Sequence, residues 1–273
     1  MPLEKIKTHD NNRAIWRLLT TGDGHLLIEE RDMNDRSVHY SLISFKTGNY
    51  VLSNYIPDEK YWVGVEAIHN GLIYFHGFVK PDMPMHRGIT AFDVKSGKVV
   101  WKNDNLSYLF ILNNKVYCYS MKFESKEFYV LDAFTGEVTA NLGNNYTEVN
   151  QLKAEAEILS YQTDMNFPYT PGTSGNDEAE SNAAHYLSLA DPGGVSEYIL
   201  TGNYFFCASN YPSAHGYNTE FYAISRKKGK VILRERINKD IRGIALDNFF
   251  TKSEYLFLLK EKKCVEIIKF TAD

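Results

Sequence analysis

The stretch Gly88–Trp101, GITAFDVKSGKVVW, decides the fold that we predict for this chain. Apolar residues alternate with others on both sides of a short polar turn that ends in Gly97. Successive side chains of a strand point to opposite faces, so alternation gives each strand one buried and one exposed face. The glycine supplies the positive φ that a short hairpin turn requires. The stretch therefore predicts a β-hairpin.

The same pattern occurs three more times along the chain. The other copies are HYSLISFKTGNYVL at 39–52, EFYVLDAFTGEVTA at 127–140 and EFYAISRKKGKVIL at 220–233. The turn glycines Gly48, Gly97, Gly136 and Gly229 follow one another at intervals of 49, 39 and 93 residues, and the last interval is two periods. A repeat of about 40–50 residues is typical of β-propellers, whose blades have four strands each.

Two further strand-like runs precede most of these hairpins. They are WVGVEAI (62–68) and LIYFHGF (72–78), SYLFILN (107–113) and KVYCYSM (115–121), and SEYILTG (196–202) and YFFCASN (204–210). Turn residues separate the members of each pair, as Asn70-Gly71 does in the second unit. Each unit is therefore predicted to be a meander of strands A, B, C and D, and the fold class is an all-β propeller.

The second unit resembles the PQQ-like repeat of quinoprotein-type propellers, which reads Ala-x-Asp-x-x-Thr-Gly-Lys-x-x-Trp. The residues that fill this pattern are Ala91, Asp93, Ser96, Gly97, Lys98 and Trp101, with serine in place of threonine. The third unit keeps Asp132, Thr135 and Gly136. The resemblance covers about half of the chain and implies a type of blade, not an activity. It implies that Trp101 and Asp93 are structural residues between blades.

The two ends of the chain are predicted to share one blade. IRGIALD (241–247), YLFLLKE (255–261) and CVEIIKF (264–270) are three strand-like runs without a fourth, and LEKIKTH (3–9) precedes the first complete unit. Unpaired sheet edges promote aggregation. We therefore expect the N-terminal strand to close the last blade, and residues 1–273 to form a single domain.

The fourth unit, about 147–191, allows two interpretations. VNQLKAEAEI (149–158), ILSYQTD (158–164) and HYLSLAD (185–191) fit strands of a degraded blade, which gives six blades. Val149, Leu152, Ala156 and Leu159 also fit helical spacing, and Ala, Glu, Gln and Lys favour a helix. An insertion of that kind would leave five blades. We favour six.

The loops between strands B and C are the expected location of function. They are long and varied, whereas the turns between strands C and D are short, and binding residues concentrate on loops held by a rigid scaffold. The longest, at about 163–184, is rich in Pro, Gly and polar residues. The second and fifth units offer the most polar and aromatic variety. The candidate ligand-binding residues are Asp82, His86, Arg87, His215 and Tyr217.

Motifs for catalysis or metal binding do not occur in the sequence. It has no Gly-x-Ser-x-Gly elbow, no phosphate-binding glycine loop and no His-Glu-x-x-His run, so we expect neither a metal nor a cofactor. A quinone cofactor is disfavoured because enzymes of the resembled type are exported and have more blades. Glu66 and Arg17 lie in predicted A strands, which line the channel of a propeller.

Composition restricts the choice of partners. The net charge of −4 disfavours a nucleic-acid binder. No apolar run reaches the length of a signal peptide or membrane span, and the three cysteines lie far apart, so we expect a cytoplasmic protein without a membrane partner. We expect a non-catalytic binding or scaffold propeller for an unknown protein or small molecule. The alternative is a small-molecule or glycan hydrolase or lyase with a site assembled from several B–C loops.

Overall fold

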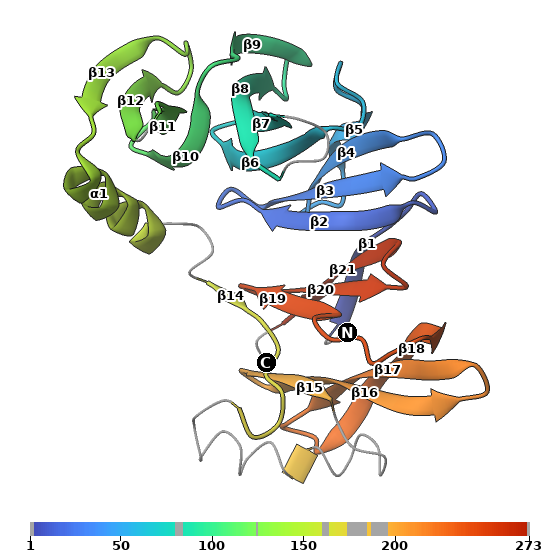
Figure 1. The fold of residues 1–273 in the computed structure, drawn as a ribbon. Coiled ribbons are helices and arrows are strands. Elements are labelled where there is room, and N and C mark those ends of the chain that lie inside the picture. Colours follow the sequence, from blue (N-terminus) through green and yellow to red (C-terminus); the bar gives the residue numbers. More distant parts are fainter. Residues whose placement is uncertain are drawn as a thin grey trace. The chain divides into compact units, whose positions relative to one another are not determined.

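A computed structural model describes residues 3–79, 84–123, 125–159, 164–173, 185–186 and 196–271 (Figure 1). The chain divides into two compact units. Residues 16–44 and 49–163 form one, which we call the three-sheet unit. Residues 1–15, 45–48 and 164–273 form the other, which we call the two-sheet unit.

The three-sheet unit contains three successive four-stranded sheets, and in each of them every strand pairs with the next. The first consists of β2 (Ala14–Thr20), β3 (His25–Asp32), β4 (Ser37–Ser44) and β5 (Tyr50–Tyr55). The second consists of β6 (Val63–His69), β7 (Leu72–Phe78), β8 (His86–Asp93) and β9 (Lys98–Asn103). The third consists of β10 (Ser107–Leu112), β11 (Lys115–Met121), β12 (Lys126–Asp132) and β13 (Val138–Gly143).

The two-sheet unit contains a fourth meander and a sheet that joins distant parts of the chain. The meander consists of β15 (Glu197–Thr201), β16 (Tyr204–Ser213), β17 (Gly216–Ser225) and β18 (Lys230–Ile241). The other sheet has the order β1 (Leu3–Asp10), β21 (Cys264–Phe270), β20 (Tyr255–Lys260), β19 (Phe249–Lys252) and β14 (Met165–Asn166). β1 runs antiparallel to β21, with Leu3 opposite Phe270.

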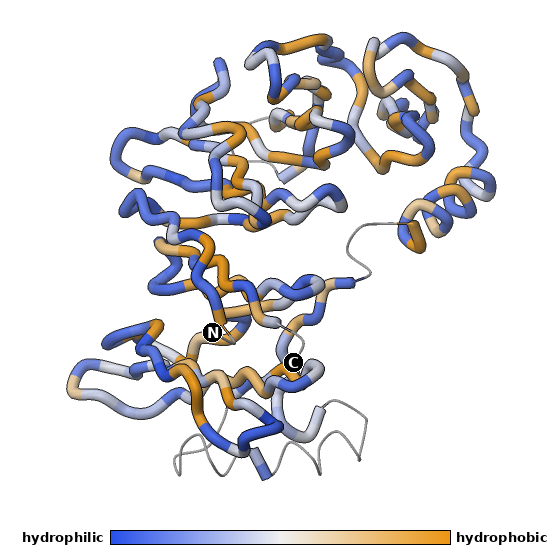
Figure 2. The backbone as a smooth tube through the Cα atoms, turned by 180° about the vertical axis from the view of Figure 1, so that it is seen from behind, coloured by the Kyte–Doolittle hydropathy of each residue, from blue (hydrophilic) through white to orange (hydrophobic). Residues whose placement is uncertain are grey.

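The predicted fold class is confirmed at the level of the blade. Each unit that the glycine pattern marks is a four-stranded antiparallel meander, and the five sheets of the described residues fit a count of five or six blades. In Figure 2 the apolar residues run along the strands, whereas most connecting turns are hydrophilic. Of the long loop expected at 163–184, residues 164–173 are described; 163 and 174–184 lie outside the described residues.

The hairpin turns have the predicted geometry. The repeat glycines have positive φ, +68° at Gly97 and +73° at Gly136. The Asp93 carboxylate accepts hydrogen bonds from the backbone N–H groups of Lys95 and Ser96, at 3.1 Å each. Asp93 therefore stabilises the turn of its own sheet, which corrects the expectation that it lies between blades.

Trp101, in contrast, does lie between neighbouring sheets. The side chain of this β9 residue is buried, and its Nε1 donates a 2.9 Å hydrogen bond to the carbonyl oxygen of Ala133, after β12. A Cβ atom on Gly136 would lie 2.6 Å from the indole ring. The second sheet is thus joined to the third through an apolar cluster that also contains Tyr74 and Leu131.

Helix α1 (Tyr146–Ile158) stands where we expected the first strand of the fourth unit. Asn145 caps the helix by accepting a 3.2 Å hydrogen bond from the backbone N–H of Glu148. Val149, Leu152 and Ala156 fall on one helical face and pack against the third sheet. The strand expectation was wrong because this apolar spacing and the cap act together. HYLSLAD lies outside the described residues except for His185 and Tyr186.

A second correction concerns IRGIALD at 241–247. β18 ends at Ile241, and the next strand, β19, begins at Phe249. Between them the Glu197 carboxylate accepts hydrogen bonds from the backbone N–H groups of Asp247 (2.6 Å) and Asn248 (3.3 Å), and Asp247 has a φ of +58°. A left-handed residue and a carboxylate that accepts two successive N–H groups define a turn, so the apolar residues of this run do not form a strand.

The ion pairs of Glu266 with Lys5 and Lys260 predict that the stability of the fold decreases in acid. Burial alone would raise the pKa of the Glu266 carboxyl, but hydrogen bonds from Lys260 and Lys5, each 2.8 Å in length, lower that pKa below its usual value. Because the folded-state pKa is depressed, Glu266 stabilises the fold above about pH 4.3, and this contribution is lost as the pH falls through the folded-state pKa.

We expect Glu266→Gln to reduce the difference in unfolding free energy between pH 7 and pH 3. Urea unfolding at both pH values measures this difference in free energy. Glu4→Gln on the exposed side of β1 is the control and should leave the difference unchanged. Equal pH dependence in wild type and Glu266→Gln would contradict the assignment.

Candidate functional site

The structure places the predicted site residues in two different units. His86 and Arg87 begin β8 in the three-sheet unit. His215 and Tyr217 belong to the two-sheet unit, with Tyr217 on β17. Asp82 lies outside the described residues. Ligand binding by these five residues, as two separate patches on the second and fifth units, stays a prediction.

The fifth unit has no long loop between strands B and C. β16 continues to Ser213 and β17 begins at Gly216, so a tight hairpin turn joins strands B and C of this unit, and His215 is exposed in it. The backbone of Ile241 passes close to this turn, which is why residue 216 is a glycine. A Cβ atom on Gly216 would lie 2.2 Å from the carbonyl oxygen of Ile241. This hairpin therefore offers no enclosed site around His215.

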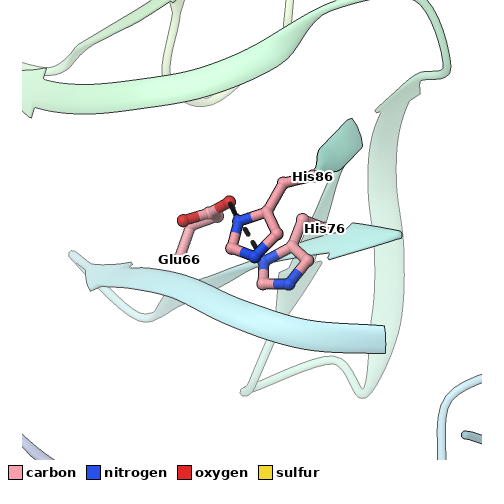
Figure 3. A group of neighbouring side chains, drawn as sticks. All are labelled: Glu66, His76 and His86. Carbon is pink, nitrogen blue, oxygen red and sulfur yellow. Dashed lines mark hydrogen bonds and ion pairs between the residues drawn. The ribbon is translucent and has the colours of Figure 1, made fainter. Parts of the chain in front are cut away.

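His86 belongs instead to a cluster with Glu66 and His76 on adjacent strands (Figure 3). Nδ1 of His86 lies 2.8 Å from Oε1 of Glu66, and Nδ1 of His76 lies 3.0 Å from the same oxygen. The two imidazole rings are stacked, with centroids 3.5 Å apart and planes 10° apart. We call these three residues the Glu–His cluster. β6, β7 and β8 each contribute one member.

The local backbone explains why three strands deliver these side chains to one point. His76 lies opposite Gly64 in the β6–β7 pairing, and a Cβ atom on Gly64 would lie 2.7 Å from the His76 ring. The missing side chain of Gly64 is therefore the space that the imidazole fills. The register of the pair shifts between Val65 and Ala67, so Glu66 is the extra residue of a β-bulge. Bulges redirect side chains and are frequent beside functional sites.

The charge distribution of the cluster keeps its carboxylate ionised. Burial alone would raise the pKa of Glu66, but its close contacts with His76 and His86 and the charges of both rings outweigh burial and lower that pKa. His76 is buried, and 40% of the His86 side chain is exposed to solvent. Phe78 lies edge-on to both rings. An ionised oxygen beside two imidazole nitrogens can hold a proton, orient a base or bind a cation.

A pocket of about 390 Å³ lies at the same end of the second sheet. We call it the site pocket. Aromatic and apolar side chains line it together with charged groups of both signs. The residues that line it are Tyr55, Pro57, Asp58, Glu59, Val63, Phe75, His76, Gly77, Phe78, Arg87, Gly88, Thr90, Val99, Lys102 and Asp104. A second hollow of about 660 Å³ is lined by Glu66, so each of two hollows is lined by one member of the cluster.

Sequence reasoning identified His86 and Arg87 but missed the cluster as a unit. Glu66 stood out only as a charged residue of a channel-lining strand, and His76 was hidden inside the apolar run LIYFHGF. A usable signal did exist. The three residues are spaced ten apart in a predicted A–B–C meander, which brings positions at matching strand ends together.

Comparison with solved structures gives β-propellers of low similarity. A europium-containing methanol dehydrogenase is 12% identical with a TM-score of 0.33, over 96% of this chain and 52% of the other. The propeller domain of the trilobed protease from Pyrococcus furiosus is 10% identical with a TM-score of 0.34, over 97% and 72%. TolB from Acinetobacter baumannii is 13% identical with a TM-score of 0.30, over 92% and 65%. The chain thus spans about half the length of the methanol dehydrogenase.

Sequence comparison gives one match, which covers part of the chain. No curated protein matches it. Residues 19–101 match a domain of unknown function, DUF4905, and this range contains the whole Glu–His cluster.

Proposed function

We propose that this chain is a non-catalytic binding propeller that takes a small molecule in the site pocket. The observation that carries the proposal is the pocket itself. Its volume of about 390 Å³ falls within the usual range for small-molecule sites, about 300–1,000 Å³. It lies beside the B–C connection of the second sheet, where regular strands hold the ends of a loop.

The lining of the site pocket suggests the class of ligand. Tyr55, Phe75 and Phe78 offer aromatic surface for an apolar ring or chain. Arg87 is exposed and its Nε donates to the backbone carbonyl of Asp104 at 3.1 Å, which holds the guanidinium at the pocket while leaving its other N–H groups for a ligand. We therefore propose a compact molecule with an apolar body and one carboxylate or phosphate group, because a guanidinium pairs with both.

Catalysis is the second candidate function, and the Glu–His cluster favours it. An ionised carboxylate within 2.8 Å of a half-exposed histidine is the arrangement that orients an imidazole as a general base. A hydrolase or lyase acting on a small molecule or glycan would use His86 in that role. The pocket and the cluster share His76, so a ligand in the pocket lies next to the cluster. Whether that ligand is bound unchanged or is converted distinguishes the two functions.

The cellular setting remains part of the proposal. Burial raises the pKa of the Cys118 thiol to about 12, so this cysteine is an unreactive apolar side chain, and all three cysteines are free. Free buried cysteines suit the reducing cytoplasm. Within the described residues, no helix has the length and apolar character needed to cross a membrane. We propose no nucleic-acid partner and no membrane partner, in keeping with the net charge of −4.

The test is a thermal-shift screen with small carboxylates and phosphates that carry an apolar group, performed in the presence of EDTA. We expect hits whose affinity falls roughly ten- to a hundredfold in Arg87→Ala, because a hydrogen bond to a charged group contributes about 1.5–3 kcal/mol. Lys95→Ala, outside the site pocket, is the charge-matched control. Hits that bind Arg87→Ala as tightly as wild type would place the ligand elsewhere.

Mass spectrometry of each hit after prolonged incubation separates the two functions. An unchanged ligand supports the binding propeller. A cleaved product that disappears in His86→Ala supports the hydrolase or lyase and contradicts the non-catalytic proposal.

A further inference from the structure

We infer that Glu66, His76 and His86 form a binding site for a divalent transition-metal ion. Their donor atoms, two imidazole nitrogens and one carboxylate oxygen, all lie within 4.8 Å of one another. Two histidines and one carboxylate that leave other positions open are a donor set of non-haem iron(II) and catalytic zinc sites. The inference goes beyond small-molecule binding, since a metal ion can occupy the cluster whether or not the site pocket takes a ligand.

The spacing of the donors fits one cation. Each imidazole Nδ1 lies 2.8–3.0 Å from Oε1 of Glu66. Two donors that lie ~2.1 Å from an ion and 90° apart are separated by about 3 Å, whereas tetrahedral donors are separated by about 3.4 Å. Both nitrogen–oxygen separations therefore match adjacent corners of an octahedron. Imidazole ligands select transition ions over magnesium, which prefers oxygen.

His76 supplies an independent observation. Its side chain is 2% exposed, and its Nδ1 is a buried atom that makes no hydrogen bond within the described part of the chain, although it lies 3.0 Å from the Glu66 carboxylate. A buried polar atom without a hydrogen bond is costly to the fold. A bound metal ion would engage this buried nitrogen.

Ion binding requires one movement. A ring nitrogen donates its lone pair in the plane of its ring, so the two stacked imidazoles must splay before both can bind one ion. His76 is held in place by Gly64 and Phe78. His86, with 40% of its side chain exposed, is the ring that has room to rotate once its contact with Glu66 is broken. Glu66 borders the second hollow, so water or a ligand can reach the remaining coordination positions.

The test is calorimetric titration of the untagged full chain with Zn²⁺ and Co²⁺, and with Mg²⁺ as the hard-cation comparison. We expect one Zn²⁺ or Co²⁺ per chain, a rise in melting temperature that grows with the concentration of that ion, and no saturable Mg²⁺ binding. Glu66→Gln and His86→Ala should each bind at least tenfold more weakly, since even outer-shell substitutions cost about 10–100-fold. Circular dichroism verifies that both variants are folded.

The matched control is His25→Ala. His25 also pairs with a carboxylate, its Nδ1 lying 3.1 Å from Asp23, but the described residues place no third donor beside this pair. Its replacement should leave the affinity unchanged. Gly64→Ala should weaken binding because its methyl group displaces His76. No stoichiometric binding by the wild type, full affinity in Glu66→Gln and His86→Ala, or an equal loss in His25→Ala would each overturn the inference. None of these outcomes bears on the ligand screen, which is performed in EDTA.

Discussion

Replacing Trp101 with alanine is expected to cost about 3–5 kcal/mol of unfolding free energy. The indole is buried between the second and third sheets, so its removal leaves a cavity in the cluster that joins them. It also removes the hydrogen bond to the carbonyl oxygen of Ala133. Chemical denaturation with fluorescence detection measures the loss.

Two further variants make the Trp101 prediction specific. Trp16→Ala, whose side chain is 65% exposed and lies under the Arg31 guanidinium, should cost about 1 kcal/mol or less. Gly136→Ala should lower stability by about 1–3 kcal/mol without touching Trp101, because the new methyl meets the indole and the backbone has positive φ. A cost below about 1 kcal/mol for Trp101→Ala would show that the repeat alignment is wrong.

Deleting residues 1–10 is expected to convert the chain into an aggregating species. The deletion removes β1 and leaves unpaired the edge of β21 that faced it, while the other edge of β21 still pairs with β20. It also exposes the Glu266 carboxylate, which loses Lys5, and uncovers the apolar cluster against which Leu3 packs. An uncovered strand of this kind is a template for pairing with another chain. Light scattering and the melting temperature measure the effect.

A synthetic peptide of residues 1–12 provides the control for the deletion. It should bind the truncated chain and restore monodispersity, because the pairing is between separate strands and needs no covalent link. A version of the peptide with proline at both Thr8 and His9, which lie opposite Glu266 and Val265, should fail. Consecutive strand residues direct their N–H groups to opposite edges, so one of the two prolines removes a donor to β21. A truncated chain that stays monomeric and melts as the intact protein does would remove the proposed role of β1 in closing the last blade.

The parts of the fold that follow local rules were predictable. The turn at Gly97 needs a left-handed residue, and the strands around it need alternation, so a short window contains the whole signal. The expectation of a strand at IRGIALD was wrong because its conformation depends on Glu197, some fifty residues away. The carboxylate of Glu197 accepts hydrogen bonds from the N–H groups of Asp247 and Asn248. The helix at Tyr146–Ile158 had a local signal, but the expectation of regular blades outweighed it.

The site was predictable only in part for the same reason. His86 lies beside a variable loop and was identified by that position. His76 became part of the cluster through the small size of Gly64, and Glu66 through a bulge. Neither the register of β6 against β7 nor the irregularity in it follows from alternation, because both arise from how three strands pack together.

The pairing of β1 with β21 also governs the order in which the protein can fold. Leu3 and Phe270 lie opposite each other, so this ladder has one of the largest sequence separations the chain allows. The entropy of closing so long a loop makes such contacts slow to form, whereas each meander needs only neighbouring strands. During synthesis β1 emerges first and has no partner until β21 has been made. We therefore expect its amide hydrogens to gain protection last in pulse-labelled refolding, with chaperone binding at residues 3–10 before that step.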